Sequence, residues 1–530
     1  MMVFSPADSV AIEAKITDEV APSALAHPLA NPLAEGLEHL PVDPTTMVIF
    51  GATGDLAQRK LLPAIYNLAH EGALPERFNL VGFALDKHTD HSFRELMHAS
   101  ITEFSRTSPK PEVLQALLFR VRYVCGTFDD PADYKSLAKV LDEFDGDADE
   151  PLNHLFYLST LPTFFSEIVT QLGANDLNHK PGAEVNVVIE KPIGRDLRSA
   201  RSLNEDVLKV LDESQIYRID HYLGKETVQN IMAFRFANAM FEPIWNSNYV
   251  DCVQITVAED LGVGTRAGYY DTAGALRDLV QNHMLQLLAL LCMEPPNKLT
   301  ANKVRDEKAK VLNAIQPPAF SEVPRMAVRG QYTRGMIGSD TVPGYLDEPG
   351  MPRSSRTESY AALRLEVSNW RWAGVPIYLR TGKRMSRKVT EIAVTLKPVP
   401  HLAFQVQGAP PAPNELVFQI QPNEGVSLSL GAKVPGAKTR IRPVNMQFQY
   451  GTSFVSQSPE AYERLILDVM RGDATLFTRV DEVEALWSIV DPVLAFWQAD
   501  PSPPLPYAAG TAGPPEAERL LQDKTRWRPL

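Results

Sequence analysis

The stretch TMVIFGATGDLA, residues 46–57, places a continuous apolar run directly before a glycine-rich turn. Such a run is typical of a strand buried on both faces of a parallel sheet. Gly51 and Gly54 permit a tight turn, and a helix that starts after it points its free amides at a pyrophosphate. The spacing is GxxGxxA rather than GxGxxG, so the motif alone is a weak signal of dinucleotide binding. Its place directly after a strand strengthens it.

The pattern continues beyond this turn as alternating helices and strands. Apolar residues recur at helical spacing over 61–69, Pro63 suits a first turn or a kink, and Gly72 is placed to end the helix. Further buried strands and one helical stripe follow at 80–84, 155–158, 185–189 and 197–211. This order predicts a Rossmann-like, doubly wound α/β domain over residues 44–220.

The second half of the chain has a different character. Strand patterns that no regular helix separates occur at 253–257, 360–367, 389–396 and 416–420. They favour a large α+β domain with a mainly antiparallel sheet over residues 221–530. Residues 1–43 are rich in Ala, Pro and acidic side chains without a clear period, so we expect a mostly disordered extension.

Composition excludes several classes of partner. The formal net charge is -13, and an acidic excess repels nucleic acid and anionic membranes, so we expect neither as a partner. Cys125, Cys252 and Cys292 are scattered and form no CxxC or His-paired motif, so we expect no disulfide framework, no metal site and a cytoplasmic location. The most apolar run, 284–293, is much shorter than the roughly 20 residues of a membrane-spanning helix. The acidic N-terminus does not have the pattern of a secretory signal.

The end of the second predicted strand bears on the choice of cofactor. An acid at this position accepts hydrogen bonds from the ribose 2′-hydroxyl of NAD, whereas an Arg pairs with the 2′-phosphate of NADP. The sequence here is Ala84-Leu85-Asp86-Lys87-His88, with both signs of charge. The residues therefore leave the choice between NAD and NADP open.

Residues 218–226, Arg-Ile-Asp-His-Tyr-Leu-Gly-Lys-Glu, crowd polar chemistry into nine positions. His221, Tyr222 and Lys225 can hold a phosphate dianion through charge-assisted hydrogen bonds. Asp220 repels phosphate, so we expect it to serve another purpose, such as orienting an imidazole. The alternative is a solvated loop or helix start with charges placed by chance.

A second candidate segment, GALRDLVQNH at 274–283, runs into the apolar stretch 284–293. A His at the edge of an apolar helix, such as His283, is more often a satisfied core residue than a catalytic one. Asp278 and His283 are five residues apart, which is about 140° around an α-helix. They can flank one ligand, but we do not expect them to share a face.

Two basic positions complete the candidates. Lys191 follows a buried strand in VIEKPIG, 188–194, and charged residues at a strand end commonly face the cleft of an open α/β sheet. Lys383 and Lys388 lie in LRTGKRMSRK, 379–388, which charge alone would assign to a solvated hairpin.

Ten segments together resemble the glucose-6-phosphate dehydrogenase family, in what looks like the family's order, from about residue 45 to the end of the chain. The block at 217–230 is the most specific. The segments are GATGDLAQRKLLPAIYNL (51–68), YLSTLP (157–162), VVIEKPIGRDL (187–197), YRIDHYLGKETVQN (217–230), RFAN (235–238), ALRDLVQNHMLQ (275–286), RDEKAKVL (305–312), VRGQY (328–332), NWRWAGVPIYLRTGKRM (369–385) and YERLILDVMRG (462–472).

The resemblance implies a role for each candidate residue. His283 is similar to the family's general base and Asp220 to its carboxylate partner. The implied phosphate ligands are His221, Tyr222, Lys225, Lys383 and Lys388, and the implied sugar-hydroxyl ligands are Glu259 and Asp278. Lys191 resembles the lysine between nicotinamide and sugar, and the implied cofactor loop comprises Gly51, Thr53, Gly54, Asp55 and Leu56, followed by Lys60.

The resemblance also implies the reaction: oxidation of D-glucose 6-phosphate at C1 to 6-phospho-D-glucono-1,5-lactone, the first step of the pentose phosphate pathway, in a homodimer or homotetramer. One departure concerns the cofactor, because Leu85 stands where the family usually carries an Arg for the 2′-phosphate of NADP, and Asp86 would repel that phosphate. We therefore expect use of both NADP and NAD, or a lean toward NAD. The alternatives are a dehydrogenase of an unphosphorylated sugar or inositol, and a non-catalytic sugar-phosphate sensor.

Overall fold

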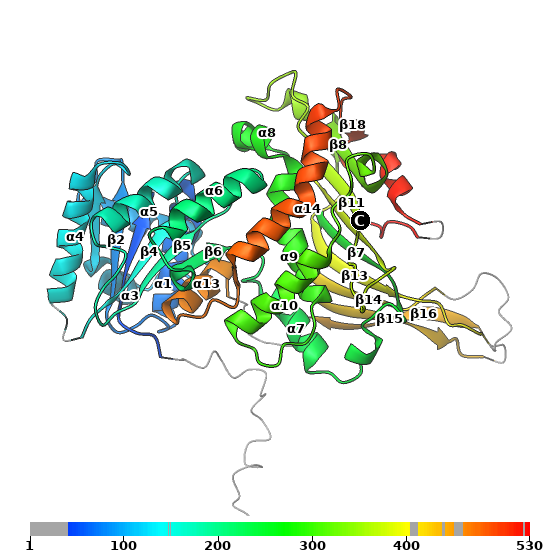
Figure 1. Ribbon diagram of the computed structural model, residues 1–530, viewed down its shortest axis with the longest axis horizontal. Helices are drawn as coiled ribbons and strands as arrows, with labels where there is room; N and C mark the ends of the chain where they lie inside the picture. Colours follow the sequence, from blue (N-terminus) through cyan, green and yellow to red (C-terminus); the bar gives the residue numbers. More distant parts are fainter. Residues whose placement is uncertain are drawn as a thin grey trace, which may run out of the picture.

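The computed structural model describes residues 41–530 except 147, 149, 403–411, 437–439, 450–458 and 523–524. Most of the extension predicted at 1–43 therefore lies outside the described residues. Figure 1 shows two domains side by side, each built on its own sheet, with α14 (Val480–Ala499) running across the second sheet toward the first domain. Within the described ranges no helix combines the length and the apolar character that crossing a membrane requires.

The first sheet has seven strands in the order β17-β6-β5-β4-β1-β2-β3. All neighbours are parallel except β17, which runs antiparallel to β6. The sheet confirms the predicted parallel core, with β17 added from late in the chain. Its strands are β1 Thr45–Phe50, β2 Phe78–Ala84, β3 Val121–Cys125, β4 Asn153–Leu158, β5 Val185–Ile189, β6 Ile216–Ile219 and β17 Phe477–Thr478.

Helices cover both faces of this sheet, so the central strand is buried on both sides. Met47 and Ile49 of β1 pack into one apolar cluster, and the alternate residues Val48 and Phe50 pack into another. This is the doubly wound arrangement that the continuous apolar run predicted. The helices are α1 Leu62–His70, α2 Asp90–Phe104 and α3 Pro111–Phe119 on the first side, with α4 Pro131–Gly146, α5 Phe165–Ala174 and α6 Leu197–Leu208 on the other.

The helix after the glycine turn begins in an unexpected form. A π-helical segment, η1 (Ala57–Leu61), precedes α1, so Pro63 lies in the first turn of α1, as expected. Gly72 follows the end of α1 with φ +69°, a left-handed conformation that glycine adopts without strain.

The second sheet has nine strands in the order β16-β15-β14-β13-β7-β12-β11-β8-β18, and a separate ribbon pairs β9 with β10. It is mainly antiparallel, as predicted, with parallel pairing between β7 and β12 and between β8 and β18. The strands are β7 Val250–Ala258, β8 Ala327–Thr333, β9 Gly335–Ile337, β10 Asp340–Val342, β11 Tyr360–Glu366, β12 Pro376–Gly382, β13 Val389–Leu396, β14 Glu415–Gln421, β15 Gly425–Lys433, β16 Ile441–Gln449 and β18 Leu505–Ala508.

Helices pack on one face of the second sheet, and the C-terminal segment around Trp527 packs on the other. The helix α9 (Leu285–Cys292) is buried along its whole length, which explains its uninterrupted apolar sequence. The remaining helices are α7 Glu226–Phe236, α8 Ala267–Ala275, η6 Leu276–Met284, α10 Ala301–Ala314, α11 Val323–Met326 and α13 Ala461–Met470, with short turns η2 Pro162–Phe164, η3 Glu213–Gln215, η4 Glu242–Ile244, η5 Gly264–Arg266, η7 Tyr345–Asp347 and η8 Pro515–Leu520.

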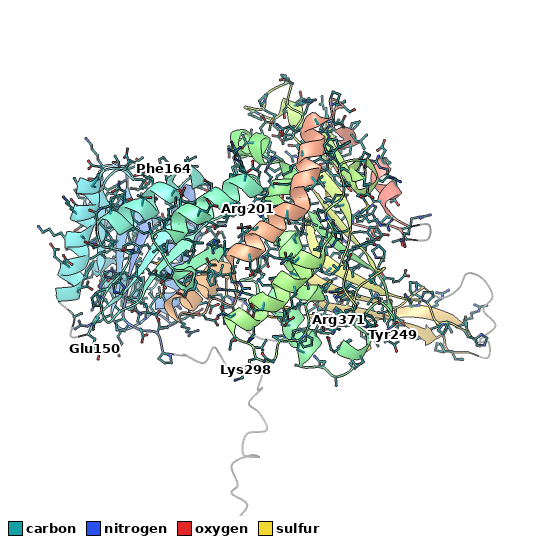
Figure 2. All side chains as sticks on the ribbon, in the orientation of Figure 1. Glu150, Phe164, Arg201, Tyr249, Lys298 and Arg371 are labelled. Carbon is teal, nitrogen blue, oxygen red and sulfur yellow. The ribbon has the colours of Figure 1, made fainter. Side chains whose placement is uncertain are left out.

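The late part of the chain returns to the first domain. Phe477 of β17 pairs with Ile219 of β6. Glu463 of α13 accepts hydrogen bonds from Arg106, 2.8 Å. Figure 2 labels Arg201 on α6, whose guanidinium pairs with Glu484 of α14 at 2.8 Å. These contacts join the two domains, and the boundary predicted at residue 220 stays a prediction.

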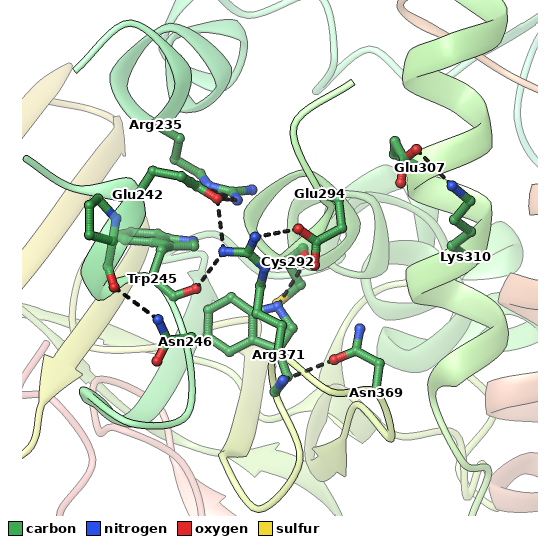
Figure 3. A network of polar contacts seen from close by, with 12 residues as sticks. Arg235, Glu242, Trp245, Asn246, Cys292, Glu294, Glu307, Lys310, Asn369 and Arg371 are labelled. Carbon is green, nitrogen blue, oxygen red and sulfur yellow. Dashed lines mark hydrogen bonds and ion pairs between the residues drawn. The ribbon is translucent and has the colours of Figure 1, made fainter. Parts of the chain in front are cut away.

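A polar network fixes the far end of α7 to the loop before β12 (Figure 3). Arg235 is fully buried and pairs with Glu242 at 3.2 Å. Arg371 pairs with the same Glu242 at 2.8 Å and with Glu294 at 2.7 Å, and it donates to the backbone O of Trp245. Shared carboxylates of this kind satisfy the buried guanidinium, which would otherwise be costly to desolvate.

Helix α10 offers a matched test of burial. Lys308 is 1% exposed and its Nζ lies 2.8 Å from Glu482, whereas Lys310 is solvent-exposed and pairs with Glu307 at 2.7 Å. We expect Lys308→Met to lower the free energy of unfolding by about 3–5 kcal/mol, because it leaves a buried carboxylate without its cation. Lys310→Met should cost less than about 1 kcal/mol. Equal losses in chemical denaturation would contradict this account.

Candidate active site

The glycine turn lies at the carboxyl edge of the first sheet, between β1 and β4. Chain order reverses there, which is where open α/β sheets bind their ligands. Gly51 has φ +78°, and a Cβ at this position would lie 2.5 Å from the backbone O of Ser159. A Cβ at Gly54 would lie 3.1 Å from the O of Gly51. The turn therefore requires glycine, and its close-packed backbone fits a dinucleotide cradle.

The residues that the sequence placed at the ribose position lie beside this turn. The Oγ1 of Thr53 donates a hydrogen bond to Oδ2 of Asp86, 2.5 Å. The Tyr123 hydroxyl donates to the backbone O of Asp86, 2.5 Å, which fixes the strand end. Leu85 is 56% exposed and carries no polar atom with which to bind a phosphate.

Two other members of the predicted cofactor loop make contacts away from it. Lys60 lies on η1, and its Nζ donates to Glu460 at 2.9 Å. Asp55 pairs with Arg59 at 2.7 Å on an exposed surface. The cofactor roles of Asp55, Leu56 and Lys60 stay predictions.

The two candidate catalytic residues meet across the domains. Asp220 follows β6 of the first sheet, and His283 lies on η6 of the second domain. His283 Nδ1 and Asp220 Oδ1 form a short hydrogen bond, and both residues are buried, at 0% and 3% exposure. Placing them together is a feature of the tertiary fold, because 63 residues separate them in sequence.

The expectation that Asp278 and His283 would not share a face is wrong. It assumed an α-helix, but residues 276–284 form a π-helix, in which hydrogen bonds run from residue i to i+5. Residues five apart are therefore about one turn above each other. Lys191 confirms the geometry, since its Nζ lies 3.5 Å from Asp278 Oδ1 and 2.9 Å from His283 Nε2.

The partners of His283 decide its tautomer. A carboxylate only accepts hydrogen bonds, so Nδ1 carries the proton that it shares with Asp220. An ammonium only donates, so Nε2 accepts from Lys191 with its lone pair. The imidazole is therefore held neutral, with the basic nitrogen turned toward Lys191 and Asp278.

Burial and charge act on this pair in opposite directions. Burial lowers the pKa of His283, Asp220 raises it and Lys191 lowers it, so that the pKa of His283 lies below its ordinary value. Burial alone would raise the pKa of Asp220, but the neighbouring His283 and Lys191 hold that pKa below its usual range. Asp220 is thus an anion at neutral pH and His283 is a neutral base.

The predicted phosphate ligands gather beside this pair. His221 and Tyr222 have ring centroids 4.5 Å and 4.2 Å from the ring of His283. The Nζ of Lys225 lies 5.6 Å from the centroid of the Tyr222 ring, and burial lowers the pKa of Lys225, with Lys388 lowering it further against the opposing charge of Glu424. Lys225 and Lys388 thus lie close enough for their positive charges to repel each other, and a bound anion would relieve this repulsion.

The protonation of His221 depends on the same cluster. Burial lowers the pKa of His221 well below its ordinary value, and His283, Lys191 and Lys225 lower it further. A bound phosphate dianion would oppose the effect of the two ammonium groups on the pKa of His221. We therefore expect His221 to gain a proton, and with it a second donor, when an anion binds.

The remaining predicted residues form the opposite wall. Glu259 follows β7, and its Oε2 accepts from Lys383 Nζ at 2.6 Å. The same ammonium lies 4.9 Å from the centroid of the Tyr270 ring. Burial alone would raise the pKa of Asp278, but Lys191 and Lys383 hold that pKa below its usual range. Lys383 and Lys191 thus act on Asp278 from the two domains.

The structure adds polar residues that the sequence analysis passed over. Gln421 at the end of β14 accepts from Lys225 at 3.1 Å and donates to Thr390 at 3.0 Å. Glu190, next to Lys191, is buried and accepts from Tyr157 at 2.6 Å. Tyr270 and Gln421 are single polar side chains that belong to no motif, so the sequence alone does not indicate that they lie at the site.

Comparison with known families decides the wider assignment. A model described as the glucose-6-phosphate dehydrogenase NAD binding domain matches residues 48–230, and a model of the glucose-6-phosphate dehydrogenase C-terminal domain matches residues 232–528. The chain belongs to the glucose-6-phosphate dehydrogenase family. It is thus an oxidoreductase with a nicotinamide dinucleotide cofactor, as the family resemblance implied.

Relatives in this family match almost the whole chain. The chain is 48% identical over 488 residues to glucose-6-phosphate 1-dehydrogenase 2 of Mycobacterium tuberculosis, covering 92% of this chain and 94% of that protein. It is 46% identical over 489 residues to glucose-6-phosphate 1-dehydrogenase of Mycolicibacterium smegmatis, covering 92% and 98%.

Solved structures of the family confirm the fold. A glucose-6-phosphate dehydrogenase in complex with its substrate glucose-6-phosphate has a TM-score of 0.81 at 34% identity, covering 90% of this chain and 96% of that chain. Glucose-6-phosphate 1-dehydrogenase from Mycobacterium avium has a TM-score of 0.79 at 37% identity, covering 92% and 98%.

The charges around His283 predict how activity depends on pH. If His283 is the base, kcat/KM falls as the pH drops through the pKa of His283, because the imidazolium cannot accept a proton. Asp220→Asn removes the group that raises this pKa, so the acid limb should move to lower pH while kcat falls. Lys191→Met removes a group that lowers it, so the limb should move to higher pH. Initial rates from about pH 4 to 9 test both shifts, and movement of both limbs in one direction would contradict the assignment.

Proposed function

We propose that this protein oxidises D-glucose 6-phosphate at C1 to 6-phospho-D-glucono-1,5-lactone, the first step of the pentose phosphate pathway. The observation that carries the proposal is the position of His283, which is held between Asp220 and Lys191 and lies close to His221 and to the ammonium groups of Lys225 and Lys388. A base that lies close to a group of phosphate-binding side chains suits a sugar that carries a reactive hydroxyl at one end and a phosphate at the other. The bound nicotinamide ring supplies the hydride acceptor.

His283 is the general base in this proposal. Its Nε2 takes the proton of the C1 hydroxyl as hydride leaves C1, and the positive charge that forms on the ring is stabilised by Asp220. Since Lys191 now donates to Nε2, the sugar hydroxyl has to take that place, and Lys191 can then turn to Asp278 alone. The imidazole needs no rotation, because Asp220 already fixes its orientation.

The walls of the cleft position the sugar. The phosphate is held by His221, Tyr222, Lys225, Lys383 and Lys388. The sugar hydroxyls donate hydrogen bonds to the carboxylates of Glu259 and Asp278. Binding energy from the phosphate end is then available to orient C1 against the base. An unphosphorylated sugar would lose these contacts and leave the cations unpaired.

The decisive experiment compares sugars and a base variant by initial rate. We expect glucose 6-phosphate to support reduction of the cofactor and glucose to be poorer by several orders of magnitude in kcat/KM. His283→Asn should lower kcat by roughly 10²–10⁴-fold with little change in KM, because general-base catalysis is worth about that factor. Equal rates with glucose, or an undiminished kcat in the variant, would refute the proposal, and tight sugar-phosphate binding without turnover would favour a sensor.

We further propose that the enzyme uses NAD and NADP with similar efficiency or favours NAD. Asp86 is anchored at the mouth of the glycine turn by Thr53 and Tyr123, where an anion attracts a ribose hydroxyl and repels a 2′-phosphate. Leu85 offers no donor. Lys87 and His88 follow these residues and are the basic candidates within this strand end.

This preference can be measured as the ratio of kcat/KM for NADP to that for NAD. We expect a ratio below about ten, which corresponds to ~1.4 kcal/mol. Leu85→Arg combined with Asp86→Ala should raise the ratio by about tenfold or more, since it exchanges repulsion for a charge-assisted contact. A wild-type ratio well above ten would show that Lys87 or another cation binds the phosphate.

Two broader assignments belong to the same proposal. We place the enzyme in the cytoplasm, because Cys125, Cys252 and Cys292 are all free thiols. We also infer a homodimer or homotetramer, which is consistent with the exposed apolar side chains of Val444 and Met446 on β16.

A further inference from the structure

A buried carboxylate outside the catalytic pair lies at the start of the π-helix that carries Asp278 and His283. Glu358, two residues before β11, is 7% exposed, and its Oε1 accepts a hydrogen bond from the backbone N–H of Leu276, 3.1 Å. Its backbone O accepts from the N–H of Ala275, 3.0 Å. The first N–H groups of a helix have no partner within the helix, so these two oxygens satisfy two of them. Burial raises the pKa of Glu358. Glu358 thus contacts the start of the π-helix through both its side chain and its backbone.

The backbone opposite this carboxylate is shaped to receive it. Gly274 has φ +70°, and a Cβ at this position would lie 2.4 Å from Oε1 of Glu358. Only glycine adopts this conformation without strain and leaves room for the carboxylate. The helical backbone is therefore interrupted at Gly274, near the end of α8, where the carboxylate of Glu358 enters.

The segment around Glu358 also contacts the backbone of Lys383. The backbone O of Ser359 accepts from the N–H of Lys383, 2.9 Å, and the Tyr507 hydroxyl donates to the O of Lys383, 2.7 Å. On the other side, Thr357 Oγ1 donates to the backbone O of Asp271 in α8, 2.6 Å. The consecutive residues 357–359 thus connect α8 and the π-helix to the end of β12, where Lys383 lies.

We propose that Glu358 is a positioning residue for the sugar phosphate. Through the N–H of Leu276 it sets the π-helix, and with it Asp278 and His283, in register with Lys383 and its partner Glu259. The inference rests on the proposed function, since it concerns the alignment of that substrate. A displacement of about 1 Å between these groups can cost on the order of a hundredfold in rate.

The experiment compares Glu358→Ala, which removes the acceptor, with Glu358→Gln, which keeps a side-chain oxygen at the same position. We expect Glu358→Ala to raise KM for glucose 6-phosphate and to lower kcat/KM by about tenfold or more, with KM for the dinucleotide unchanged. Glu358→Gln should restore most of the loss. A merely structural role would reduce the amount of folded enzyme, which scales the apparent kcat and leaves KM fixed.

A matched control is Glu391→Gln. Glu391 is also a buried carboxylate of the second sheet, but it pairs with Arg528 at 2.8 Å on the face that the C-terminal segment covers. We expect it to change thermal stability and to leave KM for glucose 6-phosphate within about twofold. If Glu358→Ala does not fold, Gly274→Ala displaces the same carboxylate and should raise the same KM.

The outcomes separate this inference from the proposed function. Wild-type enzyme without glucose 6-phosphate turnover would refute the function itself. Active wild-type enzyme together with a Glu358→Ala variant of unchanged KM would refute the positioning role alone. A Glu358→Gln variant as impaired as Glu358→Ala would refute the hydrogen bond to Leu276 as its cause.

Discussion

The hydrogen bond between Asp220 and His283 is the contact on which the site depends. Asp220 follows a strand of the first sheet, and His283 lies on the π-helix of the second domain. The bond is therefore also a direct contact between the two domains. Both groups are buried, and either alone would be costly to desolvate as an ion. Together they make one neutral base and one anion that differ in role because their surroundings differ.

Charged groups of both signs meet at the site. Lys191 and Lys225 lie close enough to influence the protonation of His221, and carboxylates such as Asp278 and Glu259 lie beside Lys191 and Lys383. Burial and the neighbouring lysines hold the pKa of His221 well below its ordinary value. A phosphate dianion bound beside these lysines would raise that pKa.

Backbone geometry also contributes to the alignment of these groups. The π-helix brings Asp278 and His283 to the same side, so one ammonium reaches both. Gly274 interrupts the helical backbone before this helix, and a Cβ there would lie 2.4 Å from an oxygen of Glu358. Gly51 allows the tight turn after β1, where a Cβ would lie 2.5 Å from the backbone O of Ser159.

The sequence by itself determined the class of each sheet, parallel in the first domain and mainly antiparallel in the second, because apolar runs, their period and the glycine turn are local properties. It also supplied the candidate residues, since 218–226 and 274–283 concentrate ionisable groups beside apolar segments. Only the tertiary structure decided that Asp220 meets His283, that residues 276–284 are π-helical, and that β17 completes the first sheet. These features arise from packing between segments far apart in the chain. A helical period read from sequence cannot distinguish i+4 from i+5 hydrogen bonding when burial on neighbouring elements selects between them.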